Sequence, residues 1–214
     1  MGKSSHFRKN KTYRRVRGRI EPAKKVLIVC EDEKSAPLYF RELCRDLQIL
    51  VFIEICGEEC GSAPINVVDY AIKRKGENFK ARGNPHFENI WCVMDVDKHT
   101  TLAKAINKAK GNKIAVALSN PCIEYWFLLH FRKTSKYFSS PDQVVLELKK
   151  HVPQYDKGFA IYSVISDKTE IALSRAVELF KTRSSEETVV TLNSSTDVHL
   201  LMNQLGEISK KPYT

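Results

Sequence analysis

The segment Val26-Leu27-Ile28-Val29-Cys30-Glu31 decides the fold, because an apolar, largely β-branched run ends there in a carboxylate. Such a run predicts a strand that is buried on both faces. A second run, Ile90-Trp91-Cys92-Val93-Met94, leads directly into Asp95-Val96-Asp97, whose two acids project from the same side of an extended backbone. Ligands of open α/β sheets gather outside the carboxyl ends of the strands, and Mg²⁺ prefers oxygen ligands. The two runs therefore predict a metal site made of Glu31, Asp95 and Asp97.

The rest of the N-terminal half alternates between helical and extended patterns. This alternation is typical of an α/β fold with a mostly parallel sheet flanked by helices. The expected elements are, in chain order, helix 34–47, strand 50–56, a helix that starts at Ser62–Pro64 and ends at Lys73–Gly76, a loop over 78–89, strand 90–94, helix 101–110 and strand 113–118.

The chain changes character at Ser119-Asn120-Pro121, where an aromatic-rich helix over 122–131 is expected. This helix is apolar almost all round and should be buried, and Glu124 is its only acid. A buried carboxylate is costly, so we expect Glu124 either to pair with a cation or to face a polar site. Further helices are expected from a capping-box start at Ser140–Gln143, over Thr169–Lys181 and over Val198–Ile208. The loop between them carries Tyr155-Asp156-Lys157-Gly158.

Positive charge is concentrated at the N-terminus. The formal net charge is +10, from 35 basic and 25 acidic residues. Residues 1–25 hold 10 of the basic residues and one acid, which leaves 25 basic and 24 acidic residues in the rest of the chain. A cationic arm attracts phosphate backbones without reading sequence. We expect nucleic-acid contacts from Arg14, Arg15, Arg17 and Arg19 of this segment and from Lys34, which follows the strand-end acid Glu31. The alternative is a solubilising or processing tail.

Composition limits the other possibilities. At 214 residues and 43% hydrophobic, the chain can bury one sizeable core. We expect a flexible basic tail over 1–24 and one domain over 25–214, with its core at about 25–131 and a helical part at about 132–214. The chain has no signal-peptide pattern and no run long enough to span a bilayer, so we expect a cytoplasmic protein without a membrane partner. The six cysteines fit neither a disulfide framework nor a zinc pattern. Gly57 and Gly61 do not complete a nucleotide P-loop, and the sequence has no dinucleotide-binding glycine fingerprint, which argues against an ATPase and a dehydrogenase.

A strand-end Glu with Asp-x-Asp can hold one or two Mg²⁺ ions that polarise a phosphoryl oxygen and activate water. Lys34 and Lys157 are candidates for neutralising charge on a pentacoordinate phosphate. Three simpler interpretations stay open. Asp-x-Asp could cap the next helix, Glu31 could interact with the dipole of helix 34–47, and Asp32 and Glu33 are most simply solvated surface acids.

The pattern of a Glu after the first strand and Asp-x-Asp after a later one resembles the Toprim catalytic domain of primases, topoisomerases and OLD-type nucleases. More specifically, the chain from about Lys24 onward resembles the RloB-like proteins, Toprim-related proteins of bacterial defence and restriction loci. The residues that carry this resemblance are Val29-Cys30-Glu31-x-Glu33-Lys34-x-x-Pro37-x-Tyr39-Phe40, Trp91-Cys92-Val93-x-Asp95-x-Asp97, Leu118-Ser119-Asn120-Pro121-Cys122-x-Glu124-x-Trp126-x-Leu128-Leu129-His130-Phe131 and Ser195-Thr196-x-Val198-His199-x-Leu201. The chain departs from the family pattern at Asp32, where Gly is usual, and at Ala36, where an acid is common.

The resemblance implies an endonuclease of an antiphage, abortive-infection system that depends on Mg²⁺ or Mn²⁺ and cleaves RNA, such as tRNA, in preference to DNA. It implies that Glu31 is a metal ligand or general base, that Asp95 and Asp97 are metal ligands, that Glu124 joins the site and that Lys157 lines it. The alternatives are a DNA nuclease, a non-catalytic subunit that binds nucleic acid or a partner, and an activity held off until an ATPase or other defence subunit releases it. A homo-oligomer also stays open.

Overall fold

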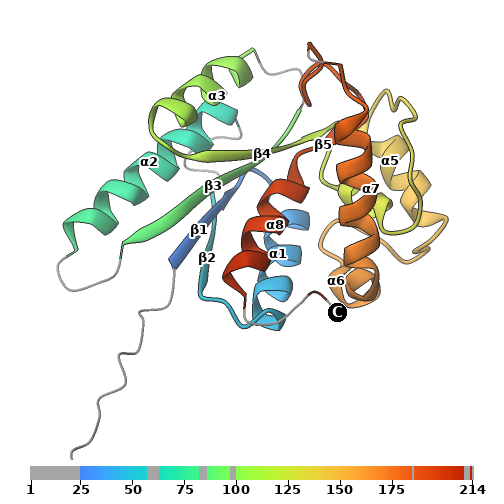
Figure 1. The fold of residues 1–214 in the computed structure, drawn as a ribbon, viewed down its shortest axis with the longest axis horizontal. Coiled ribbons are helices and arrows are strands. Elements are labelled where there is room, and N and C mark those ends of the chain that lie inside the picture. The colour runs from blue at the N-terminus through green and yellow to red at the C-terminus, as the bar shows by residue number, and fades with distance from the viewer. Residues whose placement is uncertain are drawn as a thin grey trace, which may run out of the picture.

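A five-stranded, mostly parallel sheet forms the centre of the protein (Figure 1). The structure, a computed structural model, describes residues 25–56, 63–81, 86–96, 100–184, 186–209 and 213. The strand order is β2-β1-β3-β4-β5. The parallel strands are β1 (Lys25–Cys30), β2 (Val51–Ile55), β3 (Phe87–Asp95) and β4 (Ala115–Asn120), and β5 (Ser195–Thr196) runs antiparallel to β4. The expected α/β fold with a mostly parallel sheet is confirmed.

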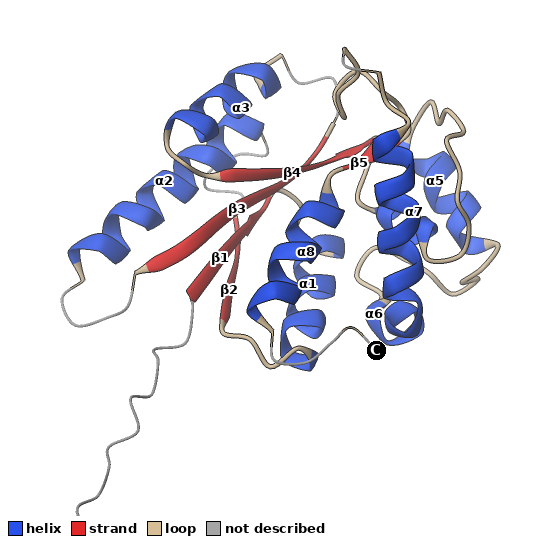
Figure 2. Ribbon diagram, viewed as in Figure 1, coloured by secondary structure: helices blue, strands red, loops and turns tan. Residues whose placement is uncertain are grey.

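Helices cover both faces of the sheet (Figure 2). α2 (Pro64–Lys80) and α3 (Leu102–Gly111) lie on one face, and α1 (Ser35–Asp46) and α8 (Val198–Ile208) lie on the other. The remaining helices form the helical C-terminal part beside α1 and α8: α4 (Glu124–Leu129), α5 (Pro141–Lys149), α6 (Tyr162–Ile165), the 3₁₀ turn η1 (Ser166–Lys168) and α7 (Thr169–Lys181).

β1 is buried on both faces, as its apolar run predicts. Val26, Ile28 and Cys30 pack in the core with α1 and α8, whereas Leu27 and Val29 pack in the core with α2 and α3. All five side chains are 0% exposed. Burial of each Val, Leu or Ile side chain contributes about 1.5–3 kcal/mol, so β1 holds the two layers together.

The prediction that the helix starting near Pro64 ends at Gly76 was wrong, and so was the loop over 78–89. α2 continues to Lys80, and β3 already begins at Phe87. Arg74 pairs with Glu54 of β2 at 2.6 Å and with Glu77, one turn along α2, at 2.7 Å. The side-chain oxygen of Asn78 accepts a hydrogen bond from the backbone N–H of Phe87 at 2.7 Å. These contacts offset the cost of about 1 kcal/mol that Gly76 imposes on a helix interior.

The other expected helices and strands agree with the sequence in kind, and α7 and α8 also agree at both ends. α7 spans the expected Thr169–Lys181, and α8 spans the expected Val198–Ile208. α4 is shorter than the expected 122–131, and β5 and α6 were not expected, because segments of two and four residues carry no periodic signal. α5 begins at Pro141 without a hydroxyl cap from Ser140; instead, Gln143 accepts a hydrogen bond from the backbone N–H of Ser139 at 3.0 Å.

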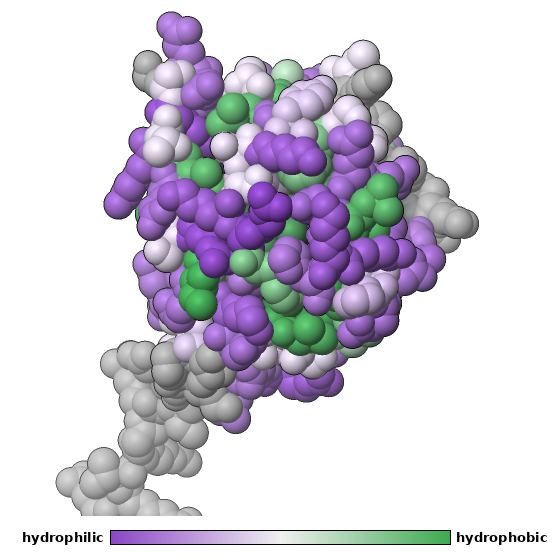
Figure 3. Space-filling model, turned by 90° about the vertical axis from the view of Figure 1, so that its right-hand side faces the viewer, coloured by the Kyte–Doolittle hydropathy of each residue, from purple (hydrophilic) through white to green (hydrophobic). Residues whose placement is uncertain are grey.

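The helical C-terminal part presents a mostly polar surface (Figure 3). The apolar side chains exposed in this part of the chain are scattered: Tyr137, Leu146, Ile171, Phe180 and Val190. Scattered apolar residues of this kind are normal for a soluble surface. None of the helices in the described ranges is long and apolar enough to cross a bilayer.

Candidate active site

Two of the acids predicted from the sequence, Glu31 and Asp95, lie at one edge of the sheet. β1 and β3 are neighbours in parallel register, with Cys30 paired to Val93. Glu31 directly follows β1, and Asp95 is the last residue of β3. The chain leaves β1 toward β2 on one side and leaves β3 toward β4 on the other. This edge is therefore the topological switch point, where ligands of open α/β sheets bind.

Glu31 joins the ends of the two strands. Its backbone N–H donates to the carbonyl of Val93 at 3.0 Å, and its carboxylate accepts a hydrogen bond from the backbone N–H of Asp95, also at 3.0 Å. A carboxylate that holds a backbone N–H restricts the peptide on which it acts. Glu31 therefore helps to fix the position of Asp95.

Asp32 caps α1. Its carboxylate accepts hydrogen bonds from the backbone N–H groups of Ala36 at 3.1 Å and Lys34 at 3.3 Å. The interaction with the helix N-terminus, which the sequence left open for Glu31, thus belongs to Asp32. The interpretation of Asp32 as a solvated surface acid was wrong. Burial raises the pKa of the Asp32 carboxyl, the bond from Ala36 lowers it, and the charge of Glu124 raises it further.

Glu124 is held by two hydroxyl groups. Its side chain is 2% exposed, and Oε1 accepts hydrogen bonds from Ser35 Oγ and Tyr155 Oη, each at 2.9 Å. Burial, followed by the charge of Glu124, raises the pKa of Tyr155, so the phenol stays protonated and donates. The expectation that Glu124 faces a polar site is confirmed. The sequence reasoning missed Ser35 and Tyr155, because these contacts span 89 and 31 residues.

A cavity of about 280 Å³ lies beside these acids, and Glu31 and Tyr155 are not among the residues that line it. Four of the predicted site residues line it, namely Lys34, Asp95, Glu124 and Lys157, together with Asp32, Glu33, Ser35 and Ile123. Lys34 also packs against the loop that carries Lys157, since a Cβ added at Gly158 would lie 3.9 Å from Lys34 Cδ. Gly158 has a φ of +101°, a conformation that favours glycine. The structure thus places two cations beside the acids.

The surroundings of Asp95 disfavour the ionised form of its carboxyl group. Its pKa is raised well above the usual value, first by desolvation, then by the charges of Glu124, Asp32 and Glu31, while Lys157 opposes the shift. An array of carboxylates that disfavour each other's ionisation is stabilised when a cation binds among them.

The acids in and beside the cavity are Glu31, Asp32, Asp95 and Glu124. All four offer carboxylate oxygens, which are the ligands that a hard divalent cation prefers. Within the described ranges, however, no three His, Cys, Asp or Glu side chains lie close enough together to hold a metal ion by themselves. Asp97, the third predicted ligand, lies outside the described residues, as do the arginines at positions 14, 15, 17 and 19. The metal set Glu31, Asp95 and Asp97 therefore stays a prediction.

The fold and the site define an α/β protein with an acidic cavity at the switch point of a mostly parallel sheet. A comparison with protein families matches residues 26–205 to the family described as RloB-like protein. This match covers most of the 214 residues, so the chain belongs to the RloB-like family. Neither a curated protein nor a solved structure gave a match.

Proposed function

We propose that this protein is a divalent-metal-dependent endonuclease whose active site is the acidic cavity at the ends of β1 and β3. One observation carries the proposal: Asp32, Asp95 and Glu124, from three separate parts of the chain, line a single cavity together with Lys34 and Lys157. A group of carboxylates with adjacent cations is the arrangement that phosphoryl-transfer sites require.

Glu31 and Asp95, with Asp97 added from the sequence, would hold Mg²⁺ or Mn²⁺, and Glu124 would line the site beside them. A bound cation of this kind supplies polarisation of a phosphoryl oxygen and a water of lowered pKa. Other side chains of the protein hold these acids in position. Ser35 and Tyr155 orient Glu124 through Oε1, and Glu31 restrains the backbone of Asp95. Lys34 and Lys157 provide positive charge for a phosphate that enters the cavity.

For the substrate we propose RNA, such as tRNA, and for the setting an antiphage defence system. This part rests on the Toprim resemblance and on the charge distribution. Ten basic residues in positions 1–25 would attract a phosphate backbone without reading its sequence. The chemistry at the phosphodiester is common to RNA and DNA. The cleavage test described below therefore compares the two substrates directly.

A second candidate is a non-catalytic subunit that binds nucleic acid. The observation that favours it is the concentration of ten basic residues in positions 1–25, against one acid. This candidate predicts salt-sensitive binding that needs neither metal nor Asp95 and that is lost when residues 1–25 are removed.

The test compares the purified full chain with Asp95→Asn on total tRNA, single-stranded DNA and double-stranded DNA, with Mg²⁺, with Mn²⁺ and with EDTA. Asp167→Asn is the matched control, because Asp167 is 71% exposed and pairs with its neighbour Lys168. We expect metal-dependent cleavage by the wild type and by Asp167→Asn, and none by Asp95→Asn. Equal cleavage by Asp95→Asn would contradict the proposal, and metal-independent binding without cleavage would favour the second candidate.

A further inference from the structure

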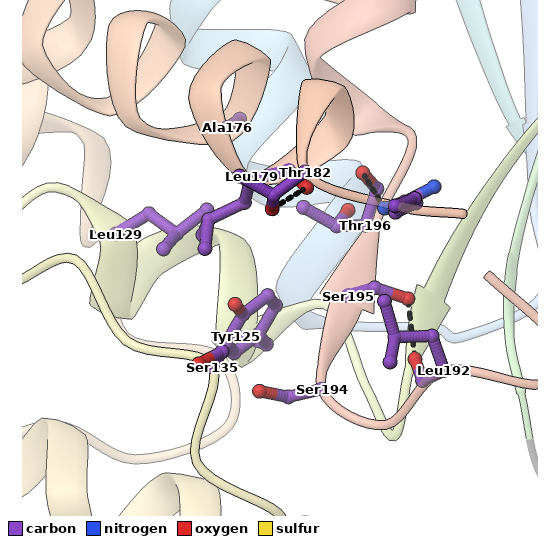
Figure 4. A pocket seen from close by; sticks show the side chains of 11 residues that line it. Tyr125, Leu129, Ser135, Ala176, Leu179, Thr182, Leu192, Ser194, Ser195 and Thr196 are labelled. Carbon is purple, nitrogen blue, oxygen red and sulfur yellow. Dashed lines mark hydrogen bonds between the residues drawn. The ribbon is translucent and has the colours of Figure 1, made fainter. Parts of the chain in front are cut away.

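A second cavity lies between α4, α7 and β5, and it shares no lining residue with the acidic cavity (Figure 4). Its volume is about 40 Å³. A single water needs roughly 10–15 Å³ on this scale, so the cavity has room for about three waters or one small ion. Tyr125, Ser194 and Thr196 are buried in its wall, whereas Ser135 and Thr182 are exposed at its rim.

Arg183 is the one charged residue among the described side chains that line this cavity. Its side chain is only 7% exposed. The terminal nitrogens Nη1 and Nη2 donate to Asp197 Oδ1 and to the carbonyl of Thr196, both at a long 3.4 Å. Nε is buried and has no hydrogen-bond partner in the described part of the chain. A buried donor without a partner costs about 1–3 kcal/mol, so an acceptor that reached Nε would stabilise the protein. The guanidinium also lies over the ring of Phe180, 5.0 Å from its centroid.

The other lining groups are of two kinds: the apolar side chains of Leu129, Ala176, Leu179 and Leu192, and a set of hydroxyls that suit a ligand with oxygen atoms. Hydroxyls come from Ser135, Thr182, Ser194, Ser195 and Thr196, and several of them donate to backbone carbonyls (Figure 4). A hydroxyl can rotate and redirect its single proton, and the planar guanidinium matches the oxygens of a phosphate group. These features together call for a negatively charged acceptor that is no larger than a phosphate.

We propose that this cavity binds a phosphate group, either as free inorganic phosphate or as the terminal phosphate of a nucleotide, through Arg183. Asp197 balances the charge of Arg183 in the absence of a ligand. Its contact is already long, so the anion competes with a weak bond rather than with a tight pair. The Ser195-Thr196 segment of the family motif, which has no role in the acidic cavity, would form one wall of this site.

The test follows the Nε–H signal of Arg183 by NMR in the full chain labelled with ¹⁵N-arginine, with Arg183→Lys used for assignment. The protein is titrated with sodium phosphate, adenosine monophosphate, adenosine and sodium acetate at constant ionic strength. We expect a saturable shift of this signal with phosphate or with the monophosphate, and none with adenosine. A shift with phosphate alone identifies the free anion as the ligand, and a shift with the monophosphate identifies a terminal phosphate.

Two variants keep the proposal falsifiable. Ser135→Phe blocks the exposed rim while leaving Arg183 in place, and it should abolish the shift. Arg183→Lys should weaken phosphate binding about tenfold or more, because Lys cannot provide the planar fork. This variant lacks the Nε–H signal, so its phosphate affinity is compared with that of the wild type by isothermal titration calorimetry. No saturable shift in the wild type, an equal shift with adenosine or acetate, or an unchanged shift in Ser135→Phe would each overturn the proposal.

Discussion

The hydroxyl of Tyr155 donates a hydrogen bond to Glu124 Oε1 at 2.9 Å, and this bond links the loop after α5 to the first residue of α4. Ser35, at the start of α1, donates to the same oxygen at 2.9 Å. Both donors meet one oxygen of a side chain that is almost fully buried. Glu124 is therefore held in one orientation, with its carboxylate on the wall of the acidic cavity.

Tyr155→Phe should keep the fold and weaken the proposed activity. The variant removes one hydrogen bond to a buried carboxylate, and such bonds are worth about 1.5–3 kcal/mol. We expect urea unfolding to show a loss of about 1–3 kcal/mol, and cleavage to fall about tenfold or more because Glu124 gains freedom. Tyr137→Phe is the matched control, since Tyr137 is 67% exposed. If Tyr155→Phe and Tyr137→Phe behave alike in both assays, Tyr155 does not position Glu124.

Asp95→Asn should unfold at a higher urea concentration than the wild type in metal-free buffer near neutral pH. The folded-state pKa of Asp95 is raised, so its ionisation costs stability as the pH rises from the unfolded pKa through the folded pKa. An amide removes this cost, and we expect a gain on the order of 1 kcal/mol. Addition of Mg²⁺ should stabilise the wild type and not the variant. A wild type that is indifferent to Mg²⁺ and no less stable than Asp95→Asn would contradict this prediction.

His130 should destabilise the protein as the solution becomes acidic. Burial lowers its pKa to about 4 from an ordinary value of 6.5. The neutral ring is favoured in the folded state, so its contribution to stability is complete above pH 6.5 and is lost as the pH falls toward 4. His130 should contribute at most about 1.4 kcal/mol per pH unit to the slope of the unfolding free energy against pH. Urea unfolding of the wild type and His130→Leu between these pH values tests this, and equal slopes would rule out a role for His130.

Gly76→Ala should stabilise the protein by about 0.5–1 kcal/mol, because Gly76 lies inside α2 and alanine loses less entropy in a helix. A Cβ added there meets no described atom within 4 Å. Gly206→Ala in α8 is the contrasting variant, since its Cβ would lie 2.9 Å from Tyr213 Cε2. Thermal unfolding should therefore rank Gly76→Ala above the wild type and Gly206→Ala at or below it. The reverse order would show that α2 does not continue through Gly76 in solution.

The sequence by itself determined which segments form the four parallel strands of the sheet and where Glu31 and Asp95 lie. The β-branched runs of β1 and β3 have a local pattern, and each ends in a carboxylate, so their strand assignment and the placement of Glu31 and Asp95 at a common edge followed from short-range information. The apolar character of α4 also predicted that Glu124 is buried in a polar surrounding.

Only the tertiary structure decided how these residues are used. It assigned the cap of α1 to Asp32 and the contact with the Asp95 backbone to Glu31, a distinction between adjacent acids that depends on φ and ψ rather than on pattern. It also brought Ser35 and Tyr155 to Glu124. Partners separated by many residues leave no periodic trace in the sequence, because only folding brings them together. For the same physical reason, the extension of α2 past Gly76 became visible only through the pairing of Arg74 with a neighbouring strand.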